Sequence, residues 1–500
     1  MNEVRTSMPD WLRQRAASTP ERLALLSSGE RFSYAELDHR VDAASQRLIE
    51  AGVEPGARVA LLAGNGTAFV VAVHAVARAG GVLVPLNLRL TPPELAWQLA
   101  DAGATHLLFD AARSGVATSL VKDDASIRPL ALELVTARPS RTSGHADVMA
   151  EGRRFDLEAT HSIIYTSGTT GRPKGALLTY GNHFWSAVGS ALNLGLRPED
   201  RWLACLPLFH VGGLAILLRS AVYGTTAIVH ESFDPSRVNA AIDDDGVTII
   251  SVVANILQRM LAERRGRPYP DTLRCVLLGG GPAPEPLLRE CETMGVPVVQ
   301  TYGLTESSSQ VATLAPEDAL RKLGSAGRPL FGSEVCIVSP DGRTCEANEA
   351  GEIVVRGSTV TPGYLNRPDE SARALADGWL HTGDVGYLDS EGYLYVLDRR
   401  DDLIVSGGEN VYPAEIEAVL QSHPGVIEAG VYGVADDRWG QTPVAVVVLE
   451  ASAGVTPEAL ITHCRERLAA YKAPSRIIIR PSLPRNAAGK LLRSELRRQG

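Results

Sequence analysis

Short apolar runs rich in β-branched residues alternate with amphipathic segments through most of the chain. The runs 248–253 (TIISVV), 275–278 (CVLL) and 298–301 (VVQT) are typical of buried strands. Buried strands that alternate with helical segments form βαβ units, in which the strands are parallel. We therefore predict an α/β fold for the first part of the chain.

A different pattern begins at about residue 324 and continues to residue 398. Short strands alternate there with Gly and Asp turns, as in 351–357 (GEIVVRG) and 391–398 (EGYLYVLD). Close spacing of short strands favours a small, mostly antiparallel unit over another βαβ unit.

A charged run at 398–402 (DRRDD) precedes a second complete set of elements. One helix is expected from Pro413, because Pro is favoured in the first helical turn. Another helix is expected after Thr456, because Thr is a good N-cap. The residues that remain suffice for an independent domain. We predict an N-terminal domain at 1–399 and a small α+β C-terminal domain at 400–500.

The charge balance limits the partners of the protein. The 500 residues include 49 Lys and Arg against 58 Asp and Glu, which leaves a formal net charge of −9. Nucleic acids and anionic membrane surfaces require a basic face, so we expect neither as a main partner. An anionic small molecule would have to be held by local basic residues and backbone amides.

The chain lacks the patterns of secretion and of membrane insertion. Its N-terminus has no apolar segment of the kind found in signal peptides. Its longest apolar stretch, 69–85, is interrupted by His74 and Arg78 and falls short of a membrane span. The cysteines are scattered without a C-x-x-C pair, which argues against a disulfide scaffold or a zinc site. We expect a cytoplasmic protein, and homo-oligomer formation stays open.

The segment 165–175 (YTSGTTGRPKG) combines Gly, hydroxyl and basic residues directly after the strand-like 162–164. Glycines let backbone N–H groups turn toward one point, and hydroxyl groups add donors without bulk. The pattern predicts a loop that binds a polyphosphate, with a flexible linker as the alternative. The spacing of a Walker A loop is absent. The candidate ligands are Thr166, Ser167, Gly168, Thr169, Thr170 and Lys174.

These eleven residues resemble the phosphate-binding signature of the adenylate-forming superfamily, which includes acyl-CoA synthetases, adenylation domains and beetle luciferases. The family's other signatures are matched in the same order by 300–306 (QTYGLTE), 378–384 (GWLHTGD), 398–402 (DRRDD), 406–410 (SGGEN) and 484–490 (PRNAAGK). The resemblance covers the whole chain. It implies a large N-terminal domain, with parallel α/β sheets and a small β-barrel-like unit, and a mobile C-terminal domain.

The resemblance also implies a reaction in two steps. ATP would activate a carboxylic acid as an acyl-adenylate, and the acyl group would then pass to the thiol of coenzyme A. Thr305 would bind the α-phosphate, and Glu306 would hold Mg²⁺, a cation that prefers oxygen ligands. Lys490 would bridge the attacking carboxylate and the α-phosphate, as a long, charged side chain can.

The remaining roles concern the nucleotide and coenzyme A. By resemblance, Tyr302 would stack on the adenine and Asp384 would accept the ribose hydroxyls. The full set of expected nucleotide contacts is Gly280, Gly281, Tyr302, Gly303, Asp384 and Arg399. Asp401 would be the hinge of the C-terminal domain, and Gly407 and Gly408 would line the tunnel for the thiol. Lys472 is a candidate for the phosphates of coenzyme A.

Two stretches, 277–284 (LLGGGPAP) and 324–330 (GSAGRPL), most resemble the o-succinylbenzoate–CoA ligases of menaquinone biosynthesis. Such a substrate has a second carboxylate that needs an anchor. Arg219 lies in the apolar segment 213–220 (GLAILLRS), where a cation must find an anion or reach solvent. It is our candidate anchor, with an internal Asp or Glu as its alternative partner. His210 is expected either to line or gate the acyl pocket or to be structural.

Three rival functions stay open at this stage. The acid could be another aromatic or a fatty acid, or the enzyme could load the phosphopantetheine arm of a carrier protein. A relative that only binds nucleotide would not need catalytic residues, and the presence of Lys490, Glu306 and Asp384 argues against it.

Overall fold

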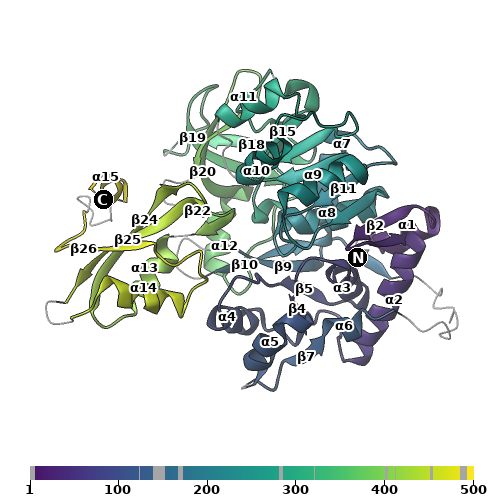
Figure 1. The fold of residues 1–500 in the computed structure, drawn as a ribbon, viewed down its shortest axis with the longest axis horizontal. Coiled ribbons are helices and arrows are strands. Elements are labelled where there is room, and N and C mark those ends of the chain that lie inside the picture. The colour runs from purple at the N-terminus through teal and green to yellow at the C-terminus, as the bar shows by residue number, and fades with distance from the viewer. Residues whose placement is uncertain are drawn as a thin grey trace.

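The protein divides into a large N-terminal part and a smaller C-terminal lobe, which lies beside it (Figure 1). The computed structural model describes residues 6–122, 124–138, 153–166, 173–280, 285–319, 321–339, 341–399, 404–411, 413–450, 454–484 and 493–499. We call the described residues from 404 onward the C-terminal lobe.

The first sheet of the N-terminal part is parallel except at one edge, where β9 and β10 pair antiparallel. In spatial order its strands are β10 (Lys174–Thr179), β9 (Thr160–Thr166), β5 (Val82–Pro85), β4 (Arg58–Leu62), β6 (His106–Phe109) and β7 (Arg128–Ala131). One face is covered by α3 (Thr67–Ala79), and the other is covered by α4 (Pro92–Ala102) and α5 (Ser114–Val121). Both faces are therefore buried, which explains the continuously apolar strands.

The second sheet contains the strands predicted from the sequence. In spatial order its strands are β17 (Arg328–Pro329), β16 (Ala312–Thr313), β15 (Val298–Tyr302), β14 (Cys275–Leu278), β13 (Ile249–Val252), β11 (Arg201–Ala204), β12 (Thr226–Val229), β2 (Leu23–Ser27) and β3 (Glu30–Ser33). Neighbours from β15 to β2 pair in parallel. The prediction of parallel strands near 248–253, 275–278 and 298–301 is therefore confirmed.

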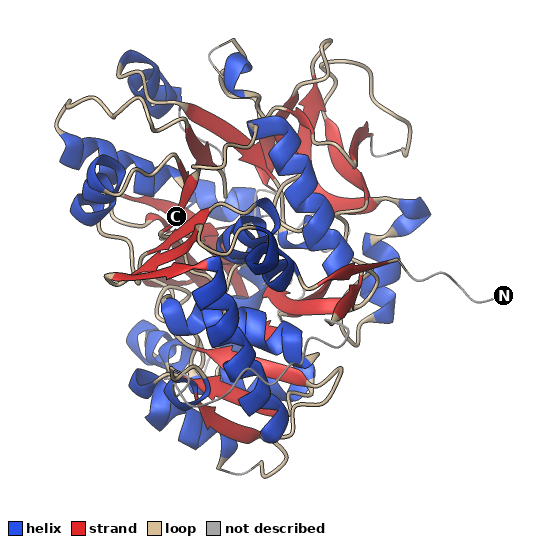
Figure 2. Cartoon of the chain, turned by 90° about the vertical axis from the view of Figure 1, so that its right-hand side faces the viewer, coloured by secondary structure: helices blue, strands red, loops and turns tan. Residues whose placement is uncertain are grey.

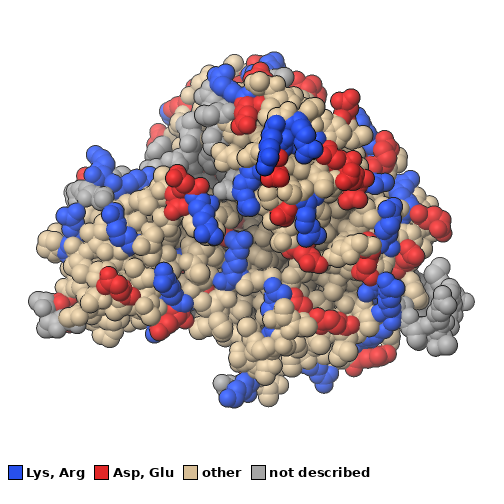
Figure 3. All heavy atoms as spheres, viewed as in Figure 1, with Lys and Arg blue, Asp and Glu red and all other residues tan. Residues whose placement is uncertain are grey.

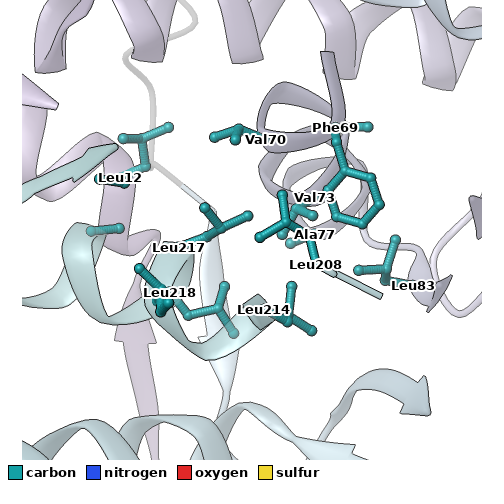
Figure 4. Close-up of a cluster of buried hydrophobic side chains, with 14 of the residues drawn as sticks. Leu12, Phe69, Val70, Val73, Ala77, Leu83, Leu208, Leu214, Leu217 and Leu218 are labelled. Carbon is teal, nitrogen blue, oxygen red and sulfur yellow. The ribbon is translucent and has the colours of Figure 1, made fainter. Parts of the chain in front are cut away.

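Helices cover this second sheet on both faces too, and Figure 2 shows helices and strands alternating in layers. The helices are α7 (Tyr180–Leu194), α8 (Val211–Tyr223), α9 (Pro235–Asp244), α10 (Ala254–Arg264) and α11 (Glu285–Thr293). The main core joins the two sheets, because side chains of α3 and α8 point toward one another (Figure 4). Phe69, Val73 and Leu217 are each at most 2% exposed there. The apolar segment that begins at Phe69 is thus a core helix.

The unit that follows is antiparallel, as the sequence predicts. Its strands are β18 (Ser333–Val338), β19 (Gly351–Gly357), β20 (Leu380–Leu388) and β21 (Leu394–Arg399), with α12 (Pro368–Ala374) between β19 and β20. Asp384 pairs with Arg399 in the register of β20 and β21. This register brings the GWLHTGD segment to one end of the unit, next to the second sheet.

The C-terminal lobe packs helices on one mixed sheet. The strands are β22 (Ile404–Ser406), β23 (Glu409–Val411), β24 (Val426–Asp436), β25 (Gly440–Leu449) and β26 (Arg476–Ile479), and the helices are α13 (Pro413–Gln421), α14 (Pro457–Arg465) and α15 (Arg493–Gln499). The side chain of Thr456 caps α14 by accepting from the backbone N–H of Ala459 at 3.3 Å. The predicted helices are therefore confirmed. The predicted boundary near residue 400 falls outside the described residues and stays a prediction.

The other elements connect these units. They are β1 (Ser7–Pro9), β8 (Arg154–Asp156), α1 (Trp11–Ser18), α2 (Tyr34–Glu50), α6 (Leu132–Val135), η1 (Ala111–Arg113), η2 (Thr305–Ser307), η3 (Pro316–Asp318) and η4 (Ala376–Gly378). Among the described helices, none is both long and apolar enough to cross a membrane. On the face drawn in Figure 3, Lys and Arg are interspersed with Asp and Glu among the described residues.

Candidate active site

A cavity of about 1040 Å³ lies where the second sheet, the antiparallel unit and the C-terminal lobe meet. Segments far apart in the sequence line it: Thr166 at the end of β9, Gly279–Gly280 after β14, Gly303–Glu306 after β15, Leu380–Asp384 of β20 and Gly407–Glu409 of the C-terminal lobe. Ligand sites of parallel sheets lie beyond the carboxyl ends of the strands. The cavity therefore has the position expected for a nucleotide and its co-substrates.

Glu306 stands at one end of this cavity, directly after β15, with its carboxylate held by two hydroxyl groups. Its Oε1 accepts from the hydroxyl of Tyr364 at 2.9 Å and from that of Thr166 at 3.4 Å. Lys174 Nζ lies 5.3 Å from the ring centroid of the same tyrosine. Thr305 lines the cavity beside this group. A carboxylate, two hydroxyls and an ammonium thus converge where the sequence predicts the phosphates.

Asp384 is fixed by a buried phenol. Its Oδ2 accepts from the hydroxyl of Tyr302 at 2.8 Å, and both side chains are at most 7% exposed. Tyr302 also packs into the hydrophobic cluster of the antiparallel unit. The tyrosine therefore orients the carboxylate predicted to bind the ribose, while its stacking on the adenine stays a prediction.

Arg219 is buried in the wall of the cavity without an acidic partner among the described residues. Its guanidinium donates to Ser186 Oγ at 3.1 Å and lies 5.6 Å from the ring centroid of Trp202, while its Nε has no hydrogen-bond partner. Burial lowers the pKa of this arginine. Among the described residues, no Asp or Glu pairs with Arg219, so the alternative of an internal acidic partner is not found there.

The start of α8 shapes the same pocket. A Cβ at Gly213 would lie 2.4 Å from the carbonyl oxygen of Pro207, so the close approach of this turn requires glycine. A Cβ at Gly212 would meet nothing within 4 Å. Position 212 thus opens into space next to His210, which leaves room for the body of an acyl group.

His210 contacts the C-terminal lobe across the cavity. Its Nε2 lies 3.0 Å from Glu409 Oε2, and Arg89 approaches the other oxygen of Glu409 at 3.2 Å. Burial by itself would raise the pKa of Glu409, but its contacts with His210 and Arg89 outweigh burial, and the pKa is lowered. The carboxylate therefore stays ionised and ties the lobe to the N-terminal part.

Lys472 lines the cavity, but its ammonium is paired with two carboxylates. The side chain is 4% exposed, and its Nζ donates to Glu415 at 2.8 Å and to Glu94 at 3.0 Å. Its charge is satisfied by two carboxylates, so in this arrangement it is not open to the phosphates of coenzyme A.

The structure brings together many of the predicted site residues, and others lie outside the described residues. Those that line the cavity are Thr166, His210, Arg219, Gly280, Gly303, Thr305, Glu306, Asp384, Gly407 and Gly408. Outside the described residues are Ser167, Gly168, Thr169, Thr170, Gly281, Asp401, Lys490 and the side chain of Arg399. The roles of this second group stay predictions.

The sequence interpretation missed three residues of the site. Tyr364 orients Glu306 from 58 positions away, and no local pattern marks it. Ser186 lies mid-helix in α7 and binds Arg219. Glu409 is buried and belongs to the matched SGGEN segment, where only the glycines received a role. The acidic residue inside this segment was the signal that could have found it.

The AMP-binding enzyme family matches residues 12–365, and the family described as AMP-binding enzyme C-terminal domain matches residues 415–490. The chain belongs to the AMP-binding enzymes. Within this family, a 2-succinylbenzoate–CoA ligase of Geobacillus kaustophilus (strain HTA426) is 54% identical over 493 residues, which are 99% of this chain and 98% of that protein. The resemblance inferred from the motifs is therefore confirmed.

Two solved structures of o-succinylbenzoate CoA synthetase from Bacillus subtilis have the same fold as this AMP-binding enzyme. A double mutant bound with the product analogue OSB-NCoA has a TM-score of 0.92 at 45% identity and covers 99% of both chains. The complex with the acyl-adenylate intermediate OSB-AMP has a TM-score of 0.75 at 45% identity and covers 98% of both chains. The predicted fold class is confirmed by this similarity.

The two TM-scores differ although the coverage of the chains is nearly the same. Sequence divergence cannot cause this difference, because the identity is 45% in both comparisons. A rigid-body rotation of one domain lowers the overall similarity and leaves the fold of each domain unchanged. The lobes of this chain are thus arranged as in the product-analogue complex.

Proposed function

We propose that this chain is a 2-succinylbenzoate–CoA ligase, which converts 2-succinylbenzoate, ATP and coenzyme A into the acyl-CoA thioester, AMP and diphosphate. The observation that carries the choice of acid is Arg219, a cation buried in the cavity wall that donates to Ser186 and has no acidic partner among the described residues. A dicarboxylic acid leaves one carboxylate behind when the other is activated. The remaining carboxylate would pair with this guanidinium.

In the first step, the substrate carboxylate attacks the α-phosphate of ATP and diphosphate leaves. Both reactants are anions, so alignment and neutralisation of charge supply most of the catalysis. Thr305, which lines the cavity, would bind the α-phosphate, and Lys174 with the residues 167–170 would hold the leaving phosphates. Lys490 would add its ammonium between the two reacting groups.

The donor set at Glu306 fits Mg²⁺. No described group of three or more His, Cys, Asp and Glu side chains could hold a metal by itself. Mg²⁺ bound to a nucleotide needs only one or two carboxylates, since phosphate and water oxygens complete its shell. Glu306 would hold the ion, whose charge then offsets that of the phosphates. Tyr364 and Thr166 keep the carboxylate oriented.

In the second step, the thiol of coenzyme A replaces AMP on the acyl carbon. The arrangement of lobes in this structure suits that step, because Gly407 and Gly408 of the C-terminal lobe line the cavity. Backbone without side chains leaves a narrow passage for the thiol arm. Asp384 would keep the ribose of the leaving AMP in place through both steps.

One comparison of substrates tests the proposal. The purified protein is incubated with ATP, Mg²⁺ and coenzyme A, and with 2-succinylbenzoate, benzoate or a fatty acid. We expect CoA-dependent AMP release with 2-succinylbenzoate at a kcat/KM at least about 10²-fold above that of the other acids, by the cost of an unpaired buried charge. Equal rates with a monocarboxylic acid would disprove the choice of acid. Acid-dependent pyrophosphate exchange without CoA turnover would favour loading of a carrier protein.

A cytoplasmic location also stays a prediction.

A further inference from the structure

The N-terminus of α4 carries a set of contacts that hold the C-terminal lobe against the N-terminal part. Lys472 of the lobe donates to Glu94 of α4 at 3.0 Å and to Glu415 of its own lobe at 2.8 Å. The hydroxyl of Thr91, the N-cap of α4, lies 3.1 Å from the backbone oxygen of Arg467. They are formed by other residues than the contact between His210 and Glu409.

One carboxylate oxygen of Glu94 caps its own helix, and the other binds the C-terminal lobe. Its Oε2 accepts from the backbone N–H of Thr91 at 2.8 Å, as the third residue of a capping box does. Its Oε1 accepts from Lys472. The carboxylate is 11% exposed, so the ion pair between the lobes is largely shielded from solvent.

Each member of this ion pair has a second partner on its own side. If the lobe rotated away, Lys472 would keep Glu415, and Glu94 would keep the N-terminus of α4. Breaking a buried ion pair is normally costly because one charge is left unpaired. That penalty is small here, so the contact can form and break repeatedly. Burial alone would lower the pKa of Lys472, but Glu415 and the other neighbours raise it, and the ammonium stays charged.

We propose that Glu94 is a positioning residue for thioester formation, which holds the C-terminal lobe through Lys472 in the orientation that places Gly407 at the cavity. The inference rests on the proposed function, since it assigns Glu94 to the second of its two steps. Glu94 itself does not line the cavity. It therefore acts on the rate through Lys472 of the lobe, which does line the cavity.

The test uses the full-length protein with Glu94→Gln. Gln also completes a capping box, so the helix terminus is kept while the charge that binds Lys472 is removed. Glu36→Gln is the matched control, because Glu36 caps α2 in the same way, accepting from the backbone N–H of Ser33 at 2.8 Å. No ion pair of Glu36 occurs among the described residues. Equal melting temperatures of both variants would show that folding is intact.

Two rates are measured for each protein. The first is acid-dependent pyrophosphate exchange, and the second is the single-turnover reaction of preformed acyl-adenylate with coenzyme A. We expect Glu94→Gln to slow the second rate about tenfold, which is typical for loss of a charged hydrogen-bond partner, and to leave the first unchanged. Glu36→Gln should change neither.

Two results would overturn the role of Glu94: an unchanged rate with coenzyme A, or an equal loss in both rates. The second result would indicate a merely structural role. Failure of the proposed function is distinguishable, because the wild-type protein would then show no exchange with 2-succinylbenzoate. In that case the same two rates are compared with whichever acid of the panel supports exchange.

Discussion

Replacing Arg219 with Met separates substrate binding from folding, because the described structure buries this charge without an acidic partner. Met has a similar length and no charge. In the substrate complex, the variant leaves the second carboxylate of 2-succinylbenzoate buried and unpaired, which costs about 3–5 kcal/mol. Since each 1.4 kcal/mol is a factor of ten, kcat/KM should fall by about 10²-fold to 4 × 10³-fold.

The folded protein without substrate should respond in the opposite direction. Burial lowers the pKa of Arg219, and among the described residues its guanidinium contacts Ser186 and the ring of Trp202 but no carboxylate. Exchange of a poorly compensated buried charge for an apolar side chain is often neutral or stabilising. We expect Arg219→Met to unfold at the same denaturant concentration as the wild type, or at a higher one.

The assay compares two substrates that differ in one group. They are 2-succinylbenzoate and 4-oxo-4-phenylbutanoate, which lacks the ring carboxylate. For Arg219→Met we expect a large decrease in kcat/KM for 2-succinylbenzoate and little change in kcat/KM for 4-oxo-4-phenylbutanoate. The preference for 2-succinylbenzoate should therefore be lost. Arg264→Met is a matched control, since Arg264 is 3% exposed, pairs with Asp243 at 2.7 Å and lies outside the cavity. It should lose stability and keep the preference.

The reasoning would be refuted by an equal loss of activity toward both acids, because the lost interaction would then not involve the ring carboxylate. It would also be refuted if Arg219→Met were clearly less stable and kept its preference. In that case the guanidinium would serve the fold alone.

Three further predictions concern other parts of the molecule. Glu306→Gln should slow adenylate formation by about 10²-fold, as expected for loss of an oriented charge in the active site, and pyrophosphate exchange over a range of Mg²⁺ concentrations measures this. Gly407→Ala should slow the CoA step about tenfold and leave exchange unchanged, because left-handed backbone costs a non-glycine residue about 1–2 kcal/mol and the new Cβ would lie 2.8 Å from a ring carbon of Trp439. Burial lowers the pKa of His74 to about 4 and that of His183 to about 3. In the unfolded chain these histidines bind protons near pH 6.5, whereas in the folded protein they stay neutral to lower pH. The free energy of unfolding should therefore be unaffected above pH 6.5 and fall below it, by about 1.4 kcal/mol per pH unit for each histidine. Denaturant titrations at pH 7 and pH 5 would detect this.

The parallel strands and the antiparallel unit could be predicted because their patterns are local. Residues 275–278 form β14 with the bounds read from the sequence, since a short apolar run between turns leaves little choice. The cap of α14 at Thr456 is also a local feature. Where a residue lies in a matched motif, as Glu306 and Asp384 do, the sequence also predicts that it lies in the site.

Contacts between distant segments could not be predicted in this way. The sequence left two partners open for Arg219, which are a substrate carboxylate and an internal Asp or Glu. The choice between them depends on which side chains the fold places around the guanidinium. Lys472 was considered for the phosphates of coenzyme A because it is basic and near the expected site. That interpretation fails because Glu94, nearly four hundred positions earlier in the chain, packs against it.

The predicted acyl pocket and the turn next to the predicted catalytic residues Thr305 and Glu306 are stabilised by the same hydrogen bonds. Arg219 donates to Ser186 Oγ, and Ser186 donates to the backbone oxygen of Ser308 at 2.6 Å. Ser308 and Ser309 have φ angles of 55° and 96°, a region that non-glycine residues avoid. Such backbone persists only where its surroundings hold it, and it is frequent at active sites. The buried serine that positions the predicted anchor therefore also stabilises the strained turn that follows Glu306, so the predicted anchor and the predicted Mg²⁺ ligand depend on one set of hydrogen bonds.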